Sequence, residues 1–379
     1  MASIEPIDPK GDLMIHLGNK PTPPAATSTP TSTPTSTPTR KTKQPRGRVA
    51  RTKNPPEEID KNEAESSRFQ VSLKHITISC ERAKAVFGGN FRESQADADG
   101  LYHWRIGPYF DRDAFKLVLK IVHGYLRDLP AEASLEQLAA MAAVVDDLRC
   151  HDSVWFIAKS WISKLQTKIQ PSKEKLDDLK SWILISVVFQ EAETFNQATR
   201  LAIEHSTGTI SAGDLPIYPN IIDDMEVRKQ TYIGDLKIRI KTIRNNLLRD
   251  DEEPNQKKCP IECKSMLLGS LIRALSSAGL DLEQAWADRS LSSTMQIIRE
   301  ARSPTIIGSG KDIRRPYWKV YESGYYMSEL LKVQPEFLGI HPCSLQGLLE
   351  PGVKAVESTV QGLSLASYVS MTADKPLAA

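Results

Sequence analysis

The chain has 379 residues, of which 40% are hydrophobic, so it is long enough to form two domains with separate cores. Its 49 Lys and Arg residues nearly balance 47 Asp and Glu residues, and a net charge of +2 gives no reason to expect binding to nucleic acid or to a membrane surface. The five cysteines are too few for a chain of this length, and odd in number, which is unlike a disulfide framework. The N-terminus lacks a secretory signal, and the longest apolar run, Trp182 to Phe189, is far shorter than the roughly 20 residues of a membrane span. We therefore expect an intracellular protein, in the nucleus, the cytoplasm or both.

The first predicted element is a buried strand in the sequence GDLMIHLG, residues 11–18, where an apolar run lies between two glycines. From about residue 19 to residue 67 the composition changes to Pro, Thr and Ser, with TSTP three times in succession, and then to basic and acidic residues. Such a segment buries too little apolar surface to offset the entropy of ordering, so we expect it to be disordered.

Order is expected to resume at Phe69, because Phe69, Val71 and Leu73 alternate with polar residues as in a half-buried strand. A helical segment should follow and end at Gly88-Gly89, and residues 101–106 favour another strand. This part of the sequence therefore predicts a small α/β domain.

The remaining residues show helical patterns. Ser134 and Gln137 have the spacing of a capping box. Trp155 is assigned to a helix core together with Trp161 and Trp182. Apolar residues with helical spacing mark three successive faces: Phe115, Val118, Leu119, Val122 and Leu126; Leu135, Leu138, Ala142, Val145 and Leu148; and Val154, Ile157, Ala158, Trp161 and Leu165. Further helices are predicted at about 178–204, 219–249, 264–278 and 290–301. Strands first and helices later predict an α/β domain followed by an all-α domain.

The segment FQVSLKHITISCERAKAVFGGNFRES resembles, without gaps, the second strand, first helix and following loop of BTB/POZ domains, especially the large fungal (ascomycete) group with a long helical C-terminal region. His123-Gly124 and the set Asp146, Cys150 and His151 match marks in the later helices of that group. The resemblance implies a BTB/POZ domain at 8–165 interrupted by the insertion at about 19–67, a helical domain at 166–352, and a flexible tail at 353–379. It implies a protein-protein interaction scaffold or adaptor, and it also allows a homodimer.

Phe91, Arg92 and Glu93 match the hydrophobic-x-Glu pattern that cullin-binding BTB proteins carry after this helix. An exposed aromatic can fill a partner's pocket while a carboxylate orients the complex. A cullin-type ubiquitin-ligase substrate adaptor is therefore one alternative. The other is that Phe91 closes the local core.

Cys259, Cys263, His341 and Cys343 have the number and type of ligands for a closed tetrahedral site, which predicts a structural zinc ion. Their spacings differ from those of common zinc fingers, and four unrelated residues remain the alternative.

A basic run lies within the insertion: Arg40, Lys41, Lys43, Arg46, Arg48, Arg51 and Lys53. It is compatible with a nuclear import signal or with nonspecific contact to phosphates, as in a chromatin- or transcription-associated factor, and also with a solvated loop. No aromatic residue is interleaved to stack on bases, so sequence-specific nucleic-acid binding is not expected.

No catalytic motif is found, and we expect a protein that is not an enzyme. Gly308-Ser309-Gly310-Lys311 lacks both the first glycine and the following Ser or Thr of a phosphate-binding loop. The seven histidines are scattered and form no pattern of base and nucleophile.

Overall fold

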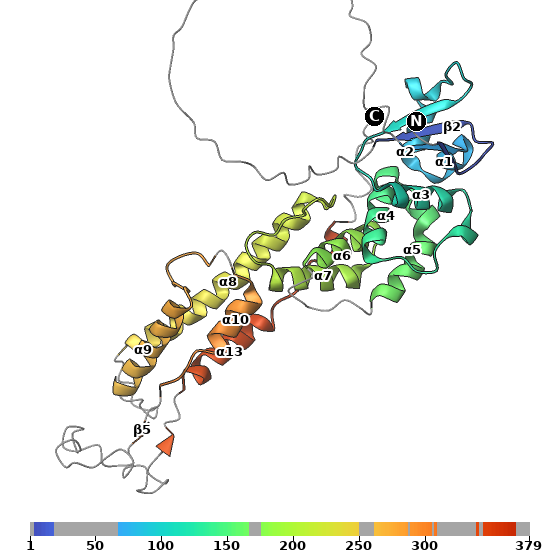
Figure 1. The fold of residues 1–379 in the computed structure, drawn as a ribbon. Coiled ribbons are helices and arrows are strands. Elements are labelled where there is room, and N and C mark those ends of the chain that lie inside the picture. Colours follow the sequence, from blue (N-terminus) through green and yellow to red (C-terminus); the bar gives the residue numbers. More distant parts are fainter. Residues whose placement is uncertain are drawn as a thin grey trace, which may run out of the picture. The chain divides into compact units, whose positions relative to one another are not determined.

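The computed structural model describes residues 4–18, 67–166, 176–249, 261–286, 289–304, 307–308, 339–340 and 344–368. It contains two compact units, the first ending at Lys159 and the second beginning at Ser160 (Figure 1). The first unit holds a small mixed sheet with helices, and the second is mainly helical. The coarse prediction of an α/β part followed by a helical part is therefore confirmed.

Four strands and five α-helices make up most of the first unit, with α5 running across its boundary. In chain order they are β1 (Ile4–Pro6), β2 (Leu13–Leu17), β3 (Ser67–Val71), α1 (Leu73–Ser79), α2 (Glu81–Gly88), β4 (Tyr102–Ile106), α3 (Arg112–Val122), α4 (Leu135–Leu148) and α5 (His151–Leu165). Two short 3₁₀ turns, η2 (Arg92–Ser94) and η3 (Leu126–Asp128), lie between them.

The sheet has the strand order β1-β3-β2-β4. Strand β2 pairs antiparallel with β3 and parallel with β4, so Ile15 lies opposite both Phe69 and Trp104. Four of the five residues of β2 are buried, because a central strand is covered on both faces. The predicted pairing of residues 11–18 with the strand after the insertion is confirmed.

One expectation for the strands was wrong, and one strand was not predicted. The strand that was predicted to include Leu73 ends at Val71, because the Ser72 side chain accepts a hydrogen bond from His75 N–H and caps α1. A short strand also precedes residue 11: β1 pairs in parallel with β3, with Ile4 opposite Arg68. Three residues are enough for such a strand because it lies at the edge of the sheet and needs only one partner.

Aromatic contacts attach helices to the sheet. The ring of Phe87 in α2 meets Trp104 and Tyr102 edge-on, with 5.7 and 6.1 Å between ring centroids. The ring of Phe115 in α3 lies 5.8 Å from that of Phe69. Both sets of contacts have the geometry that aromatic pairs prefer, and they fix α2 and α3 on strands β4 and β3.

The predicted helix faces are mostly confirmed. The capping box of Ser134 and Gln137 is formed, with 3.2 Å from Gln137 N to the Ser134 hydroxyl. Leu126 and Trp155 were wrongly placed in the core, since they are 52% and 51% exposed. Leu126 lies beyond the end of α3, and Trp155 lies about 100° around α5 from the buried Val154.

His123 joins the end of α3 to the start of α1. Its Nε2 accepts a hydrogen bond from Ser72 N–H at 3.1 Å, and its Nδ1 donates to the Leu119 carbonyl at 2.8 Å. This arrangement requires a neutral imidazole, since a protonated ring has no acceptor. Burial lowers the pKa of His123 below its ordinary value of 6.5, and the nearby His75 also lowers it.

We expect His123 to make the protein less stable in mild acid. As the pH falls below 6.5, the His123 imidazole becomes protonated in the unfolded chain while it stays neutral in the folded protein. The free energy of unfolding therefore decreases until the pH passes the lowered pKa. Urea unfolding between about pH 7 and pH 5 checks this. His123→Gln should flatten the pH dependence without abolishing it, because burial also lowers the pKa of His151. An unchanged slope would contradict the assignment.

The second unit consists of α6 (Leu176–Val188), α7 (Ala192–His205), α8 (Pro219–Leu248), α9 (Ile261–Ser277), α10 (Leu291–Arg299) and α13 (Leu345–Glu357), with the 3₁₀ turn η7 (Leu365–Ser367) and the short pair β5 (Ile307–Gly308) and β6 (Gly339–Ile340). The helix expected over 178–204 is two helices, because the chain turns at Gln190, whose φ is +57°. The other predicted helices are found with small shifts of their ends.

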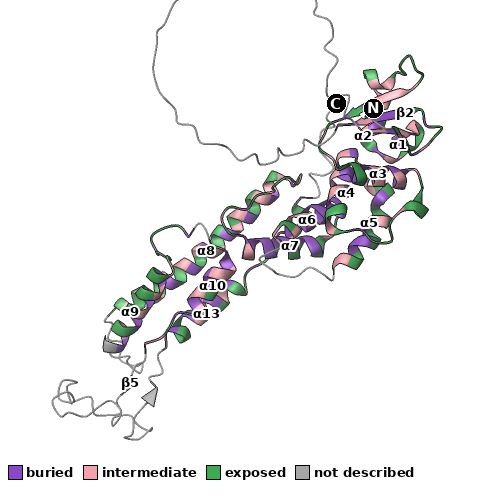
Figure 2. Cartoon of the chain, viewed as in Figure 1, coloured by how far each residue is buried: buried purple, intermediate pink, exposed green. Residues whose placement is uncertain are grey.

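Helix α8 carries buried residues along one face and exposed residues along the other (Figure 2). Ile233, Leu236 and Ile240 of this helix belong to a core that includes residues of α9, α10 and α13. Apolar burial along this long helix thus holds α8, α9, α10 and α13 together.

The expected flexible tail at 353–379 is wrong for its first part. Residue 353 lies inside α13, and the segment Ser358–Tyr368, here called the C-terminal strap, packs on α7 and α8 with Val360, Leu363 and Leu365 buried. Leu363 N–H donates to the Thr199 hydroxyl at 2.9 Å, and Arg228 donates to the Gly362 carbonyl at 2.8 Å. Residues 369–379 lie outside the described residues.

Gly362 permits the closest approach of the strap to α7, because a Cβ there would lie 1.9 Å from the Asn196 carbonyl oxygen. We expect Gly362→Ala to lower the free energy of unfolding by about 1–3 kcal/mol or more, as overpacking does. Gly234→Ala is the matched control, because Gly234 lies inside α8 with open space at its Cβ position. That change should stabilise by roughly 0.5–1 kcal/mol. Equal effects of the two substitutions in thermal unfolding would refute the close contact.

Candidate protein-interaction surface

The loop that follows α2 carries the predicted partner-binding residues. Helix α2 ends at Gly88, and the Phe91 side chain folds back over Gly89, where a Cβ would lie 2.8 Å from the ring. Phe91 nevertheless remains 43% exposed. Its ring therefore rests on the backbone of the loop and presents its other side to solvent.

Residues Arg92–Ser94 form the 3₁₀ turn η2, which fixes the backbone after Phe91. The Ser94 hydroxyl donates to the Phe91 carbonyl at 2.7 Å, and Gln95 N–H donates to the Arg92 carbonyl at 3.1 Å. Within this turn Arg92 is exposed and Glu93 is half-buried. An aromatic ring, a cation and a carboxylate thus follow one another on a short, hydrogen-bonded turn.

The rest of the loop is closed by its own hydrogen bonds. Asp97 N–H donates to the Leu101 carbonyl at 2.8 Å, and Leu101 N–H donates to the Asp99 carboxylate at 3.0 Å. Gly100 has a φ of +80°, a conformation that suits glycine at such a turn. The loop therefore returns directly into strand β4.

A chain of polar side chains ties this loop to the sheet. The Asp99 carboxylate lies 3.0 Å from His103 Nε2, and His103 Nδ1 lies 2.9 Å from His16 Nε2. His103 belongs to β4 and His16 to β2, so the chain runs from the loop across two strands. The pKa of Asp99 is lowered chiefly by the hydrogen bond from Leu101 N–H and further by His103. We infer that His103 donates to Asp99 and accepts from His16, since this assignment satisfies all three groups.

Helix α2, from which the loop extends, is itself fixed on both sides. The Arg82 guanidinium lies 5.7 Å from the centre of the Trp104 ring and forms an ion pair with Asp147 of α4. At the start of the helix, Glu81 N–H donates to the Arg149 carbonyl at 3.2 Å. The loop that carries Phe91 therefore starts from a helix whose position is fixed.

The two cysteines beneath this surface are buried. The Cys80 side chain forms a hydrogen bond with Cys150, and this bond together with burial raises the pKa of the Cys150 thiol well above its ordinary value. A thiol in this setting stays protonated and is a poor nucleophile. This pair therefore has the properties of core packing, and it offers no nucleophile at the surface.

Other residues singled out from the sequence are only partly described. Of the predicted zinc ligands, Cys263 is buried in the helical core, while Cys259, His341 and Cys343 lie outside the described residues. Among the residues that the structure describes, no group of three or more His, Cys, Asp or Glu side chains is arranged to hold a metal ion. The zinc site stays a prediction. The basic run at 40–53 also lies outside the described residues.

Two exposed aromatic residues were missed by the sequence analysis. Trp155 and Phe156 of α5 are 51% and 74% exposed. For Phe156 the signal was available in the helical phase, because Val154, Ala158 and Ile162 share one face and position 156 lies on the opposite one. Trp155 lies beside Ile162 at the edge of the buried face, so the helical phase alone does not decide its exposure.

Comparison of the chain with protein-family models, with curated proteins and with solved structures gives no match. The resemblance to BTB/POZ domains accordingly stays a prediction. In the part of the chain that the structure describes, every helix is too short or too polar to cross a membrane.

We expect the polar chain to order the loop at 91–101. In His103→Ala the Asp99 carboxylate loses its histidine partner and keeps the hydrogen bond from Leu101 N–H. A lost hydrogen bond of about 0.5–1.5 kcal/mol corresponds to roughly 2–13-fold faster local opening. Hydrogen exchange at the Asp97 and Leu101 amides measures this, and the amide of Ile15 in the central strand is the internal control. Unchanged exchange at the loop amides would show that the turn orders itself without the histidines.

Proposed function

We propose that the protein is a non-enzymatic interaction scaffold or adaptor whose first unit is a BTB/POZ domain. The order of elements supports this proposal. Strand β2 pairs across the insertion with β3, which is followed by helices α1 and α2, a loop, and later helices α3 to α5. This is the order that the resemblance implies for the matched segments.

The observation that carries the interaction role is the anchored, exposed Phe91. An aromatic ring loses little conformational entropy on binding when its backbone is already fixed, and aromatic residues in such positions often dominate binding energy. The Phe91 carbonyl accepts a hydrogen bond from the Ser94 hydroxyl of η2, and Arg92 and Glu93 follow directly. The same loop is tied to β4 and β2 through Asp99. The surface thus combines an apolar anchor with charged groups that set orientation.

A cullin is the specific partner class that the residue pattern favours. The hydrophobic-x-Glu pattern falls on Phe91, which precedes the turn η2, and on Glu93, the middle residue of that turn. Under this proposal the ring fills an apolar pocket and the carboxylate accepts hydrogen bonds at its rim. The chain would then recruit substrates to a ubiquitin ligase.

The adaptor proposal is tested by quantitative co-purification from cells that express the full chain, Phe91→Ser or Tyr109→Ser. Tyr109 is the matched control, since it is an exposed aromatic in the same unit and lies on a different loop. We expect at least one partner to be lost with Phe91→Ser alone, by a factor of about 30 or more in affinity for a hot-spot residue. If every partner is retained equally by both variants, this surface is not the interaction site.

The cullin proposal has its own readout, which is direct binding to a purified cullin N-terminal region. The intact chain should bind, and Glu93→Ala should weaken binding. Failure of the intact chain to bind would remove the cullin and would leave the wider adaptor proposal to the co-purification result.

A further inference from the structure

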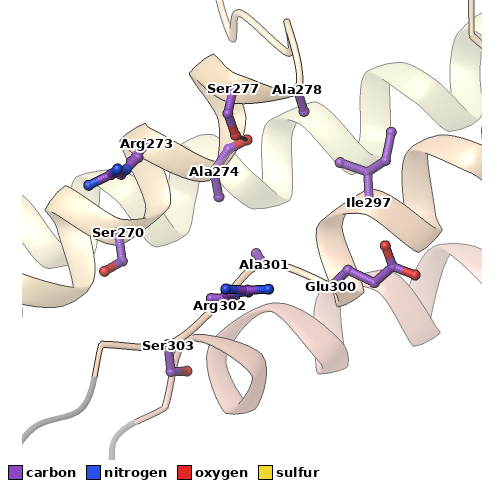
Figure 3. Close-up of a pocket in the computed structure, with 10 residues that line it drawn as sticks. All are labelled: Ser270, Arg273, Ala274, Ser277, Ala278, Ile297, Glu300, Ala301, Arg302 and Ser303. Carbon is purple, nitrogen blue, oxygen red and sulfur yellow. Dashed lines mark hydrogen bonds between the residues drawn. The ribbon is translucent and has the colours of Figure 1, made fainter.

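A cleft of about 470 Å³ opens between the second half of α9 and the end of α10 (Figure 3). One wall is formed by Ser270, Arg273, Ala274 and Ser277 of α9 and by Ala278 just beyond its end, and the other wall is formed by Ile297, Glu300, Ala301, Arg302 and Ser303. All of these residues belong to the helical unit, and none belongs to the surface around Phe91. Its volume falls within the range of ligand-binding sites in proteins.

The cleft is open because α9 has small side chains along this face. Ser270, Ala274 and Ser277 recur at helical spacing, while the larger Leu271 and Leu275 point into the core. Three partly buried apolar side chains pack against that core and form the floor: Ala274, Ala278 and Ile297. A ligand here would find an apolar floor already held in place by the helical core.

The rim carries two arginines with free guanidinium groups. Among the described residues, neither Arg273 nor Arg302 forms a hydrogen bond or an ion pair, and both are exposed. The acidic residue of the rim, Glu300, accepts a hydrogen bond from the Gln296 amide. Guanidinium groups stay charged at any physiological pH and match carboxylates in a bidentate geometry, so the free charge at this site favours an anionic ligand.

The apolar surface continues along α9 beyond the cleft. Met266 lies one turn before Ser270 on the same face and is 43% exposed. The row from Met266 to Ser277 spans about 16 Å at 1.5 Å per residue, which equals roughly three turns of a partner helix. An extended open row of this kind suits a peptide segment better than an enclosed small molecule.

We propose that the α9–α10 cleft binds an acidic amphipathic segment of a partner protein. The apolar side of that segment lies on Ala274, Ala278 and Ile297, and its carboxylates pair with Arg273 and Arg302. None of the described residues that line the cleft is aromatic, so they offer no ring on which a base could stack, which disfavours single-stranded nucleic acid as the occupant. This second surface goes beyond the adaptor role of the first unit and stands independently of it.

The test measures binding of a fluorescein-labelled helical peptide of about 14 residues to the full chain. The peptide is made of Leu, Ala and Glu, with the glutamates along the edges of its apolar face. The comparison peptide carries Lys in place of each Glu. Fluorescence anisotropy should show at least about tenfold tighter binding of the Glu peptide, with an affinity that falls as salt is added. The double variant Arg273→Glu with Arg302→Glu should reverse the preference between the two peptides.

Two further variants complete the design. Arg239→Glu changes the charge of an exposed arginine on α8 and should leave binding unchanged. Ser277→Trp should block the cleft from its exposed rim without entering the core, and circular dichroism checks that each variant folds. Equal binding of the two peptides, no binding of either, insensitivity to the double variant, or preferential binding of an oligothymidylate would each overturn the proposal.

Discussion

The structure of the first unit depends on the pairing of β2 with β3. Strand β2 is central, so it brings residues 13–17 beside both β3 and β4, and the polar chain from His16 through His103 to Asp99 relies on that alignment. The two strands are separated by about 50 residues of sequence, yet the entropy of closing such a loop grows only with the logarithm of its length. Burial of the side chains at this junction, such as Ile15 and Phe69, provides the opposing free energy.

A consequence of this arrangement is that the loop carrying the exposed ring of Phe91 is already ordered in the folded protein. The sheet positions His16 and His103, these histidines hold Asp99, and Asp99 closes the loop. The ordering entropy of the loop is therefore largely lost during folding, which leaves less to be lost when a partner binds. The same histidines are occupied with each other and with a carboxylate, which agrees with a positioning role.

The second unit follows a different principle, since its described residues are mainly helical and include only the short pair β5 and β6. Its long helix α8 supplies one side of a common core, and the C-terminal strap crosses α7 and α8 where Gly362 allows backbone to touch backbone. Larger side chains of α9, such as Leu271 and Leu275, fill this core, and the small Ser270, Ala274 and Ser277 line the cleft. Hydrophobic packing on one side of a helix and an open cleft on the other thus arise from the same distribution of side-chain sizes.

The sequence alone determined the locally encoded features: the alternating strand residues, the capping box of Ser134, and the limits of α8, which starts with a proline at residue 219. These depend on neighbours within a few residues, so a pattern of period 2 or 3.6 is enough to find them. Tertiary structure decided the rest. The pairing of β1, the exposure of Trp155, the chain from Asp99 to His16 and the packing of the strap on α7 all join residues that are distant in sequence or depend on which helix face is covered. Such features follow from how the elements pack against one another, and a local sequence pattern does not reveal this packing.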